Sequence, residues 1–180
     1  LVVFWMENIF RRFVRILLQI RMARRVIEHN EESGGIRMLF AIDHGNSAIK
    51  TPNFEFTSGL AEYLVRPPLE TDILEYDGKF WVLSGQRISY MRDKTRDERY
   101  FILPLFAIAK ELRNARGLPP MVEADLAVGL PPEHYGALRA KFAEYFKRGA
   151  VKFVFNGTPC CVVFRQVLVF PQAYAAVVPR

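Results

Sequence analysis

A short apolar run that ends in a tight, glycine-containing turn constrains this chain more than any other feature of its sequence. Residues 38–42 are all apolar, as in a central strand that is buried on both faces. Residues 43–47 are of the types that form tight turns, and a loosely alternating run, 48–56, follows and suits a strand returning beside the first. We therefore predict a β-hairpin. This argues against a P-loop or a dinucleotide-binding motif, because in both a helix follows the glycine-rich turn.

Further strand and helix patterns follow along the chain. The predicted elements are a hairpin at 74–83 around Asp77-Gly78, a helix at 96–116, a strand at 125–128, a helix from Pro131 to Lys147, and a hairpin around Asn156-Gly157 that joins 151–155 to 160–164 and continues through 166–170. Thr95 and Glu98 have capping-box spacing at the start of the first helix. Pro104 lies inside that helix, where it removes one backbone hydrogen bond and costs about 3 kcal/mol unless a kink absorbs it. This order of elements indicates a mixed α/β architecture.

Composition and charge bound the class of protein. With 180 residues, 51% of them hydrophobic, the chain can form one globular domain with a substantial core. The net charge is +6, and half of it lies in residues 1–37, which hold seven arginines and four glutamates. The remaining excess of +3 is weak evidence for nucleic-acid binding, so we expect no direct contact with nucleic acid.

Residues 1–37 precede the first predicted strand, and we expect them to be a helical extension outside the domain. Arg11, Arg12 and Arg15 interrupt their apolar residues, so no stretch approaches the ~20 residues that a membrane span needs. The same arginines argue against a secretory signal. A basic amphipathic helix lying on a membrane is the alternative for this segment.

The two cysteines, Cys160 and Cys161, are adjacent in an apolar run. Neighbouring residues of a strand point to opposite faces, which argues against a disulfide between them or a shared metal site. We expect buried thiols in a reducing cytoplasm.

The run from Ala41 to Lys50 resembles the first phosphate motif of the actin, Hsp70 and sugar-kinase superfamily. Type III pantothenate kinases have a similar motif. Five later segments narrow the resemblance: LEYDGK at 74–79, DKT at 93–95, AIAKEL at 107–112, VGLPPEHY at 128–135 and VFPQ at 169–172. In this order and spacing, they resemble the ParM-type bacterial actin-like proteins that segregate plasmids. The resemblance covers residues 38–179.

This resemblance implies the N-terminal lobe of an actin-like ATPase, with a ribonuclease H-like α/β fold. Residues 38–180 would form the lobe, a mixed sheet with flanking helices and a small β-rich insertion at about 57–95. In that family, ATP and Mg²⁺ lie between two lobes, and subunits polymerise into filaments that move plasmid DNA through an adaptor protein. We therefore expect a cytoplasmic, self-associating protein that binds ATP or GTP with Mg²⁺. The C-terminal lobe, with the opposing phosphate turn, is absent from residues 38–180, which argues against unaided ATP turnover.

Nucleoside triphosphate chemistry needs neutralised phosphate charge, a held metal and a placed water. Asp43, at a strand end, can orient the waters of a bound Mg²⁺ ion, because Mg²⁺ prefers carboxylates and retains water. Gly45 has no side chain, so the backbone there can approach a phosphate group closely. The backbone amides of Gly45, Asn46 and Ser47 can point at the β- and γ-phosphates.

Two further residues gain roles from the resemblance alone. Lys50 is in the position of the cation that contacts phosphate. Gln172 is in the position of the residue that orients the attacking water, so Gln172 and Asp43 are the candidate catalytic pair. A neutral amide holds water but is a poor base, which suits slow hydrolysis triggered by polymerisation.

The remaining polar residues of these motifs have simpler interpretations. We expect His44 to be a turn residue and not a general base, and His134 to be exposed in the first turn of a helix. Asp93-Lys94-Thr95 most simply caps a helix.

Three alternatives to the filament-forming ATPase remain from the sequence. The first is a small-molecule kinase of the same superfamily, similar to a pantothenate kinase. The second is a non-catalytic lobe that acts as an interaction module. The third, for the turn itself, is an ordinary hairpin with a solvated aspartate and lysine.

Overall fold

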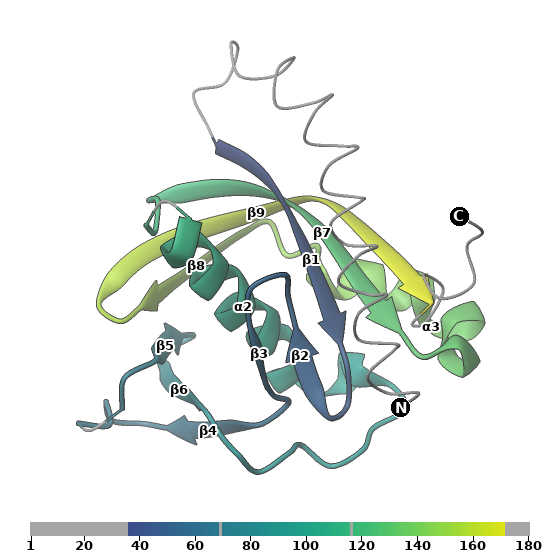
Figure 1. The fold of residues 1–180 in the computed structure, drawn as a ribbon, viewed down its shortest axis with the longest axis horizontal. Coiled ribbons are helices and arrows are strands. Elements are labelled where there is room, and N and C mark those ends of the chain that lie inside the picture. Colours follow the sequence, from purple (N-terminus) through teal and green to yellow (C-terminus); the bar gives the residue numbers. More distant parts are fainter. Residues whose placement is uncertain (1–35, 69, 116, 172–180) are drawn as a thin grey trace.

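Nine strands form one mixed sheet in the order β3-β2-β1-β7-β9-β8-β5-β6-β4 (Figure 1). The computed structural model describes residues 36–68, 70–115 and 117–171. Its strands are β1 (Ile36–His44), β2 (Ala48–Lys50), β3 (Glu55–Thr57), β4 (Leu60–Tyr63), β5 (Ile73–Tyr76), β6 (Lys79–Leu83), β7 (Met121–Leu130), β8 (Ala150–Phe155) and β9 (Thr158–Pro171). Its helices are a 3-10 turn η1 (Lys94–Arg96), α2 (Arg99–Ala115) and α3 (Pro132–Phe146).

Three parallel strands form the centre of the sheet. β1 pairs with β7 and β7 pairs with β9, and Val128 is the register partner of both Ile42 and Val169. The carboxyl ends of these strands therefore reach the same edge of the sheet (Figure 1). That edge is where ligands bind in sheets of this kind.

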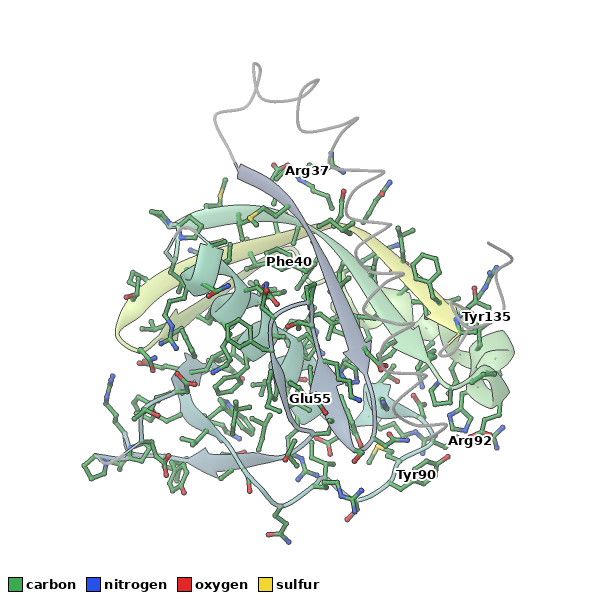
Figure 2. The ribbon with its side chains drawn as sticks, viewed as in Figure 1. Arg37, Phe40, Glu55, Tyr90, Arg92 and Tyr135 are labelled. Carbon is green, nitrogen blue, oxygen red and sulfur yellow. The ribbon has the colours of Figure 1, made fainter. Side chains whose placement is uncertain are left out.

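Both α-helices pack on one face of the sheet. The shared core contains Phe40 and Ile42 from β1, Val128 from β7 and Phe142 and Phe146 from α3. Figure 2 shows Phe40 along β1 and Arg37 at the start of the same strand. Every residue of α2 from position 100 to position 109 is buried, so this helix lies within the core and not on its surface.

The hairpin signals read from the sequence are confirmed. Asp77 and Gly78 have φ values of 51° and 70°, and Asn156 and Gly157 have values of 52° and 84°. Positive φ at both central residues belongs to the type I′ turn, whose twist matches that of the flanking strands. The predicted strand at 125–128 and helix from Pro131 to Lys147 also form, as β7 and α3.

Two predictions about secondary structure were wrong. The run 48–56 is not one returning strand but a second hairpin of β2 and β3, because Thr51 and Phe54 close a turn through Phe54 N–H to Thr51 Oγ1 (3.0 Å) and Thr51 N–H to the Phe54 carbonyl (2.8 Å). The predicted capping box is also absent. The Thr95 hydroxyl donates to Asp93 at 2.6 Å, and the long helix begins only at Arg99, whose N–H donates to the Asp97 carboxylate at 3.0 Å.

Cys160 is buried and Cys161 is half-buried, and both are free thiols, as their adjacent positions on β9 predict. No helix within the described ranges is long and apolar enough to cross a membrane. The predicted insertion at about 57–95 contains β4, β5 and β6, and β5 joins them to the main sheet by pairing with β8.

Candidate phosphate-binding site

The turn between β1 and β2 lies at the edge where the three parallel strands end. Residues 43–47, which we call the phosphate turn, begin at the end of β1 and include the three residues that link it to β2. Asp43 is the direct register partner of Lys50 across this hairpin. Directly opposed residues share one face of a sheet, so the structure brings these two predicted site residues together.

The phosphate turn is held tightly by its neighbours. The Ser58 hydroxyl donates to the Gly45 carbonyl at 2.8 Å, and Ser58 N–H donates to the Ser47 carbonyl at 3.1 Å. A Cβ atom at Gly45 would lie 2.6 Å from the Ala48 carbonyl oxygen, so the turn accepts only glycine at this position without a backbone shift.

Several polar groups of the phosphate turn have no hydrogen-bond partner among the described residues. The backbone N–H groups of Gly45, Asn46 and Ser47 find no acceptor in that part of the chain. The Asn46 Oδ1 atom is buried and likewise without a partner there. Successive amide donors in a tight turn form an anion-binding concavity, so the three backbone N–H groups fit phosphate oxygens, whereas the Asn46 oxygen is an acceptor and does not.

Charged side chains surround the phosphate turn. The Lys50 ammonium lies 3.6 Å from Glu55 Oε1 on β3. Arg87, from the loop after β6, places Nη1 3.4 Å from the Ser47 hydroxyl. Lys94 approaches from the buried side, where its Nζ contacts the His44 carbonyl. Three cations against two carboxylates, those of Asp43 and Glu55, favour an anionic ligand.

His44 is not the simple turn residue that the sequence predicts. It ends β1, its exposed fraction is 0%, and its Nε2 lies 2.7 Å from the Tyr100 carbonyl in α2. That carbonyl would normally accept the N–H of residue 104, four positions later, but residue 104 is proline and has no N–H. The imidazole N–H of His44 therefore supplies the hydrogen bond that Pro104 cannot make.

Burial is the main cause that lowers the pKa of His44, and the nearby charge of Lys94 adds to it, giving a value of about 3. Since Nε2 donates to a carbonyl, Nδ1 is the unprotonated nitrogen of the neutral ring, and it faces Lys94 Nζ at 3.4 Å. A neutral His44 that is fully buried and fully engaged is a structural link, which agrees with the expectation that it is not a general base.

Sequence reasoning missed Lys94 as a site residue. Asp93 caps η1, as predicted for this segment, but Lys94 turns inward and is only 3% exposed. Burial lowers its pKa to about 8, and the charge of Asp43 opposes that shift. The sequence signals this residue only through the Asp93-Lys94-Thr95 motif. A lysine in a segment that caps a helix does not by itself indicate burial.

His134 is also buried, at 6% exposure, so the prediction that it is exposed was wrong. Its Nε2 lies 3.2 Å from the Tyr90 hydroxyl, whose loop covers the start of α3. Gln172 lies outside the described residues. The strand before it ends at Pro171, the register partner of Leu130, at the edge that also carries the phosphate turn.

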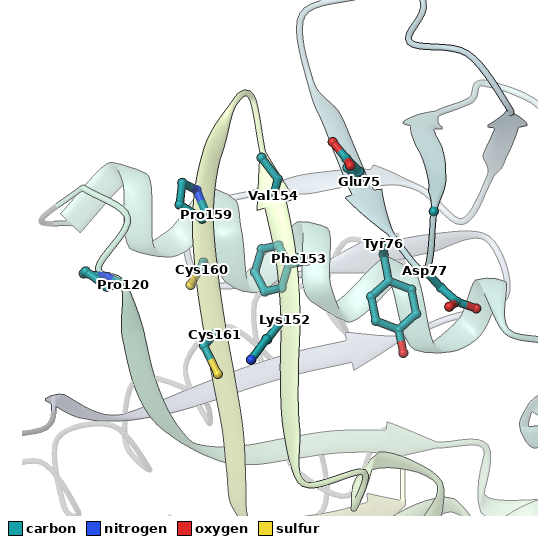
Figure 3. Close-up of a pocket in the computed structure, with 11 residues that line it drawn as sticks. Glu75, Tyr76, Asp77, Pro120, Lys152, Phe153, Val154, Pro159, Cys160 and Cys161 are labelled. Atoms are coloured by element: carbon teal, nitrogen blue, oxygen red, sulfur yellow. The ribbon is translucent and has the colours of Figure 1, made fainter.

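A cavity of about 430 Å³ opens elsewhere on the molecule, between the β5–β6 turn and the β8–β9 hairpin (Figure 3). Tyr76, Lys152 and Cys161 are among the residues that line it. A smaller one of about 190 Å³ includes Trp81 and Asp97. Neither of these two cavities includes a residue of the phosphate turn.

The described residues contain no group of three or more His, Cys, Asp or Glu side chains that could hold a metal ion. A single carboxylate, that of Asp43, is nevertheless sufficient for an ion that keeps most of its water, as Mg²⁺ does when phosphate supplies the other ligands. The donor set of the phosphate turn therefore fits a Mg²⁺–phosphate ligand bound through water.

Comparison with known proteins identifies the family. Residues 41–174 match the family described as "Actin like proteins N terminal domain". The chain belongs to this family. A search of curated protein sequences gives no significant match.

Solved structures of actin-like proteins share the fold. The apo ParM protein of pSK41 superposes with a TM-score of 0.61 at 15% identity, over 76% of this chain and 50% of ParM. An AlfA filament bound to AMPPNP gives 0.57 at 16% identity, over 76% of this chain and 55% of AlfA. The archaeal actin homologue Ta0583 in complex with ADP gives 0.55 at 17% identity, over 76% of this chain and 44% of Ta0583. The chain thus spans about half the length of these proteins.

Proposed function

We propose that this chain is the N-terminal lobe of an actin-like ATPase and that its phosphate turn binds the β- and γ-phosphates of ATP or GTP. The observation that carries the proposal is the position of the turn. It lies where β1, β7 and β9 end, with Asp43 opposite Lys50 and with amide donors that lack acceptors in the described residues. Nucleotides bound to AlfA and to Ta0583 support the same ligand class.

Each residue of the site has a defined task in this proposal. The amides of Gly45, Asn46 and Ser47 bind phosphate oxygens, and the ammonium of Lys50 neutralises their charge. Asp43 orients water molecules of Mg²⁺, and the ion, when bound, supplies charge neutralisation and a fixed phosphate geometry.

Gln172, which follows Pro171 in the sequence, is proposed to orient the attacking water. An amide can accept one hydrogen bond from that water and donate one to phosphate, but it does not remove a proton efficiently. Hydrolysis would then be slow until the second lobe closes over the nucleotide.

We further propose that the complete protein polymerises into filaments in the cytoplasm and moves plasmid DNA through an adaptor protein. Similarity to AlfA, whose filament structure is known, supports self-association. The chain would not need to contact DNA itself.

Binding of Mg·ATP tests the first part of the proposal. A fluorescent ATP analogue titrated into the chain should bind weakly, with a dissociation constant of about 1 mM or below, because residues 38–180 would supply only one side of the nucleotide site. Lys50→Met should weaken binding at least fivefold, as expected for the loss of one charged hydrogen bond. Lys152→Met, at an exposed lysine beside the β8–β9 cavity, is the control and should bind as the parent does. Equal affinities for the two variants would refute the proposed site.

Sedimentation tests the second part. The complete gene product should pellet with Mg·ATP and remain soluble without nucleotide. ATP-dependent phosphorylation of a small molecule without pelleting would instead identify a kinase of the pantothenate-kinase type. Absence of nucleotide binding by the complete product would identify a non-catalytic interaction module.

A further inference from the structure

Lys94 is a buried lysine directly behind the phosphate turn. We propose that it is a positioning residue of the phosphate site: its ammonium fixes the peptide between His44 and Gly45 and supplies positive charge from the protein side. This inference rests on the proposed function, because the charge matters only if phosphate binds at the turn.

The contacts of Lys94 reach the phosphate turn and the first turn of α2. Its Nζ donates to the His44 carbonyl and lies 3.4 Å from His44 Nδ1. The same Nζ lies 5.2 Å from the centre of the Tyr100 ring, within cation–π range. The carbonyl it holds belongs to the peptide whose N–H is that of Gly45. Fixing the carbonyl therefore fixes the direction of the first amide donor of the turn.

The position of Lys94 is itself rigidly set. Asp93 accepts a hydrogen bond from Thr95 N–H at 3.2 Å and caps η1, and its other oxygen pairs with Lys141 of α3 at 2.6 Å. Both chain neighbours of Lys94 are thus held by hydrogen bonds, which fixes the backbone from which its side chain reaches the turn.

Burial makes this charge costly unless other groups compensate it. A methionine or leucine would fill the same space without that cost, so packing alone does not account for a lysine. Asp43 provides an attractive charge, but Asp43 is also the proposed partner of hydrated Mg²⁺. A polyphosphate at the turn would add the compensation that the buried ammonium lacks.

The charged and titratable groups facing Lys94 are few. Asp43 and His44 face it from β1, and Tyr100 faces it from α2. Asp93, the residue before it in the chain, is paired with Lys141. His44 stays neutral throughout the neutral and alkaline range, so Lys94 is the group whose charge changes there.

The test is the affinity for Mg·ATP as a function of pH, measured on the whole chain with a fluorescent ATP analogue. Bound phosphate favours the charged ammonium, so the affinity of the parent should fall about sixfold between pH 7.5 and pH 9.5, the change expected if binding raises the pKa of Lys94 from about 8 by one unit. Lys94→Met should bind about tenfold more weakly at pH 7.5 and show a flat profile. If that variant does not fold, Lys94→Gln serves the same purpose.

Lys152→Met is the matched control, because it removes an exposed positive charge on β8 without removing charge behind the turn. It should keep the pH dependence of the parent. A Lys94→Met variant that retains the affinity and pH profile of the parent overturns the inference while leaving the proposed function intact. Absence of Mg·ATP binding by the parent at any pH overturns both.

Discussion

Acidification should destabilise this protein through one buried imidazole. In the folded state, burial and the charge of Lys94 hold the pKa of His44 at about 3, whereas an unfolded chain has the ordinary value of about 6.5. The unfolded state therefore binds the proton between these values and the folded state does not. The stability contributed by the neutral His44 is fully present above about pH 6.5 and is lost progressively as the pH falls toward 3.

The magnitude follows from the two pKa values. At pH 5, protonation stabilises the unfolded state by about 2 kcal/mol relative to the folded state, since each pKa unit corresponds to about 1.4 kcal/mol. Asp93 does not contribute between pH 7 and pH 5. Burial alone would raise its pKa, but hydrogen bonds from Lys141 and Thr95 outweigh that effect and lower it to about 2.

Urea unfolding at pH 7 and at pH 5 measures the effect, and the fluorescence of Trp81, which is 5% exposed, can report it. The parent should lose about 2 kcal/mol between the two pH values. His44→Gln should lose the pH dependence, whatever its absolute stability, and His134→Gln should retain it. Equal pH dependence in the parent and in His44→Gln would refute the assignment of a buried neutral imidazole at this position.

Two further predictions concern the same region. His44→Leu should destabilise the fold by about 1–3 kcal/mol, because it leaves the Tyr100 carbonyl without a hydrogen-bond donor. Pro104→Ala restores a backbone N–H to that carbonyl, so it should reduce this penalty by about 1 kcal/mol. Additive effects of the two substitutions in a double-mutant cycle would contradict the link between His44 and Pro104. Gly45→Ala should weaken Mg·ATP binding more than tenfold and lower the free energy of unfolding by about 1–3 kcal/mol. Gly85→Ala, where a Cβ meets open space, should change neither quantity. Unchanged binding in Gly45→Ala would exclude a tight phosphate turn.

Local signals in the sequence account for most of the fold. Asp77-Gly78 and Asn156-Gly157 specify their hairpins because only such residues adopt positive φ readily at both turn positions. The apolar run at 38–42 is also a local signal, and it correctly places a buried strand before the phosphate turn. The candidate turn and the opposition of Asp43 and Lys50 follow directly from that hairpin.

The remaining features depend on residues that are distant in the chain. His44 is buried because Pro104, sixty positions later, leaves a carbonyl without its helical donor. Lys94 is buried because the end of β1 offers a carbonyl and an unprotonated nitrogen to its ammonium. The capping-box prediction failed for a different reason: the spacing of Thr95 and Glu98 is correct, but the Thr95 hydroxyl is already bound to Asp93.

Binding of nucleotide phosphate by the phosphate turn can be observed residue by residue. The most direct test is the backbone amide NMR spectrum of the isotopically labelled chain during titration with Mg·ATP. The resonances of Gly45, Asn46 and Ser47 should shift most strongly and in parallel, and Lys50→Met should reduce these shifts at equal ligand concentration. Phosphate binding by the turn would be contradicted if these three amide resonances stayed unchanged at about 10 mM Mg·ATP, about ten times the weakest expected dissociation constant. Shifts confined to the residues around Lys152 and Cys161 would contradict it as well.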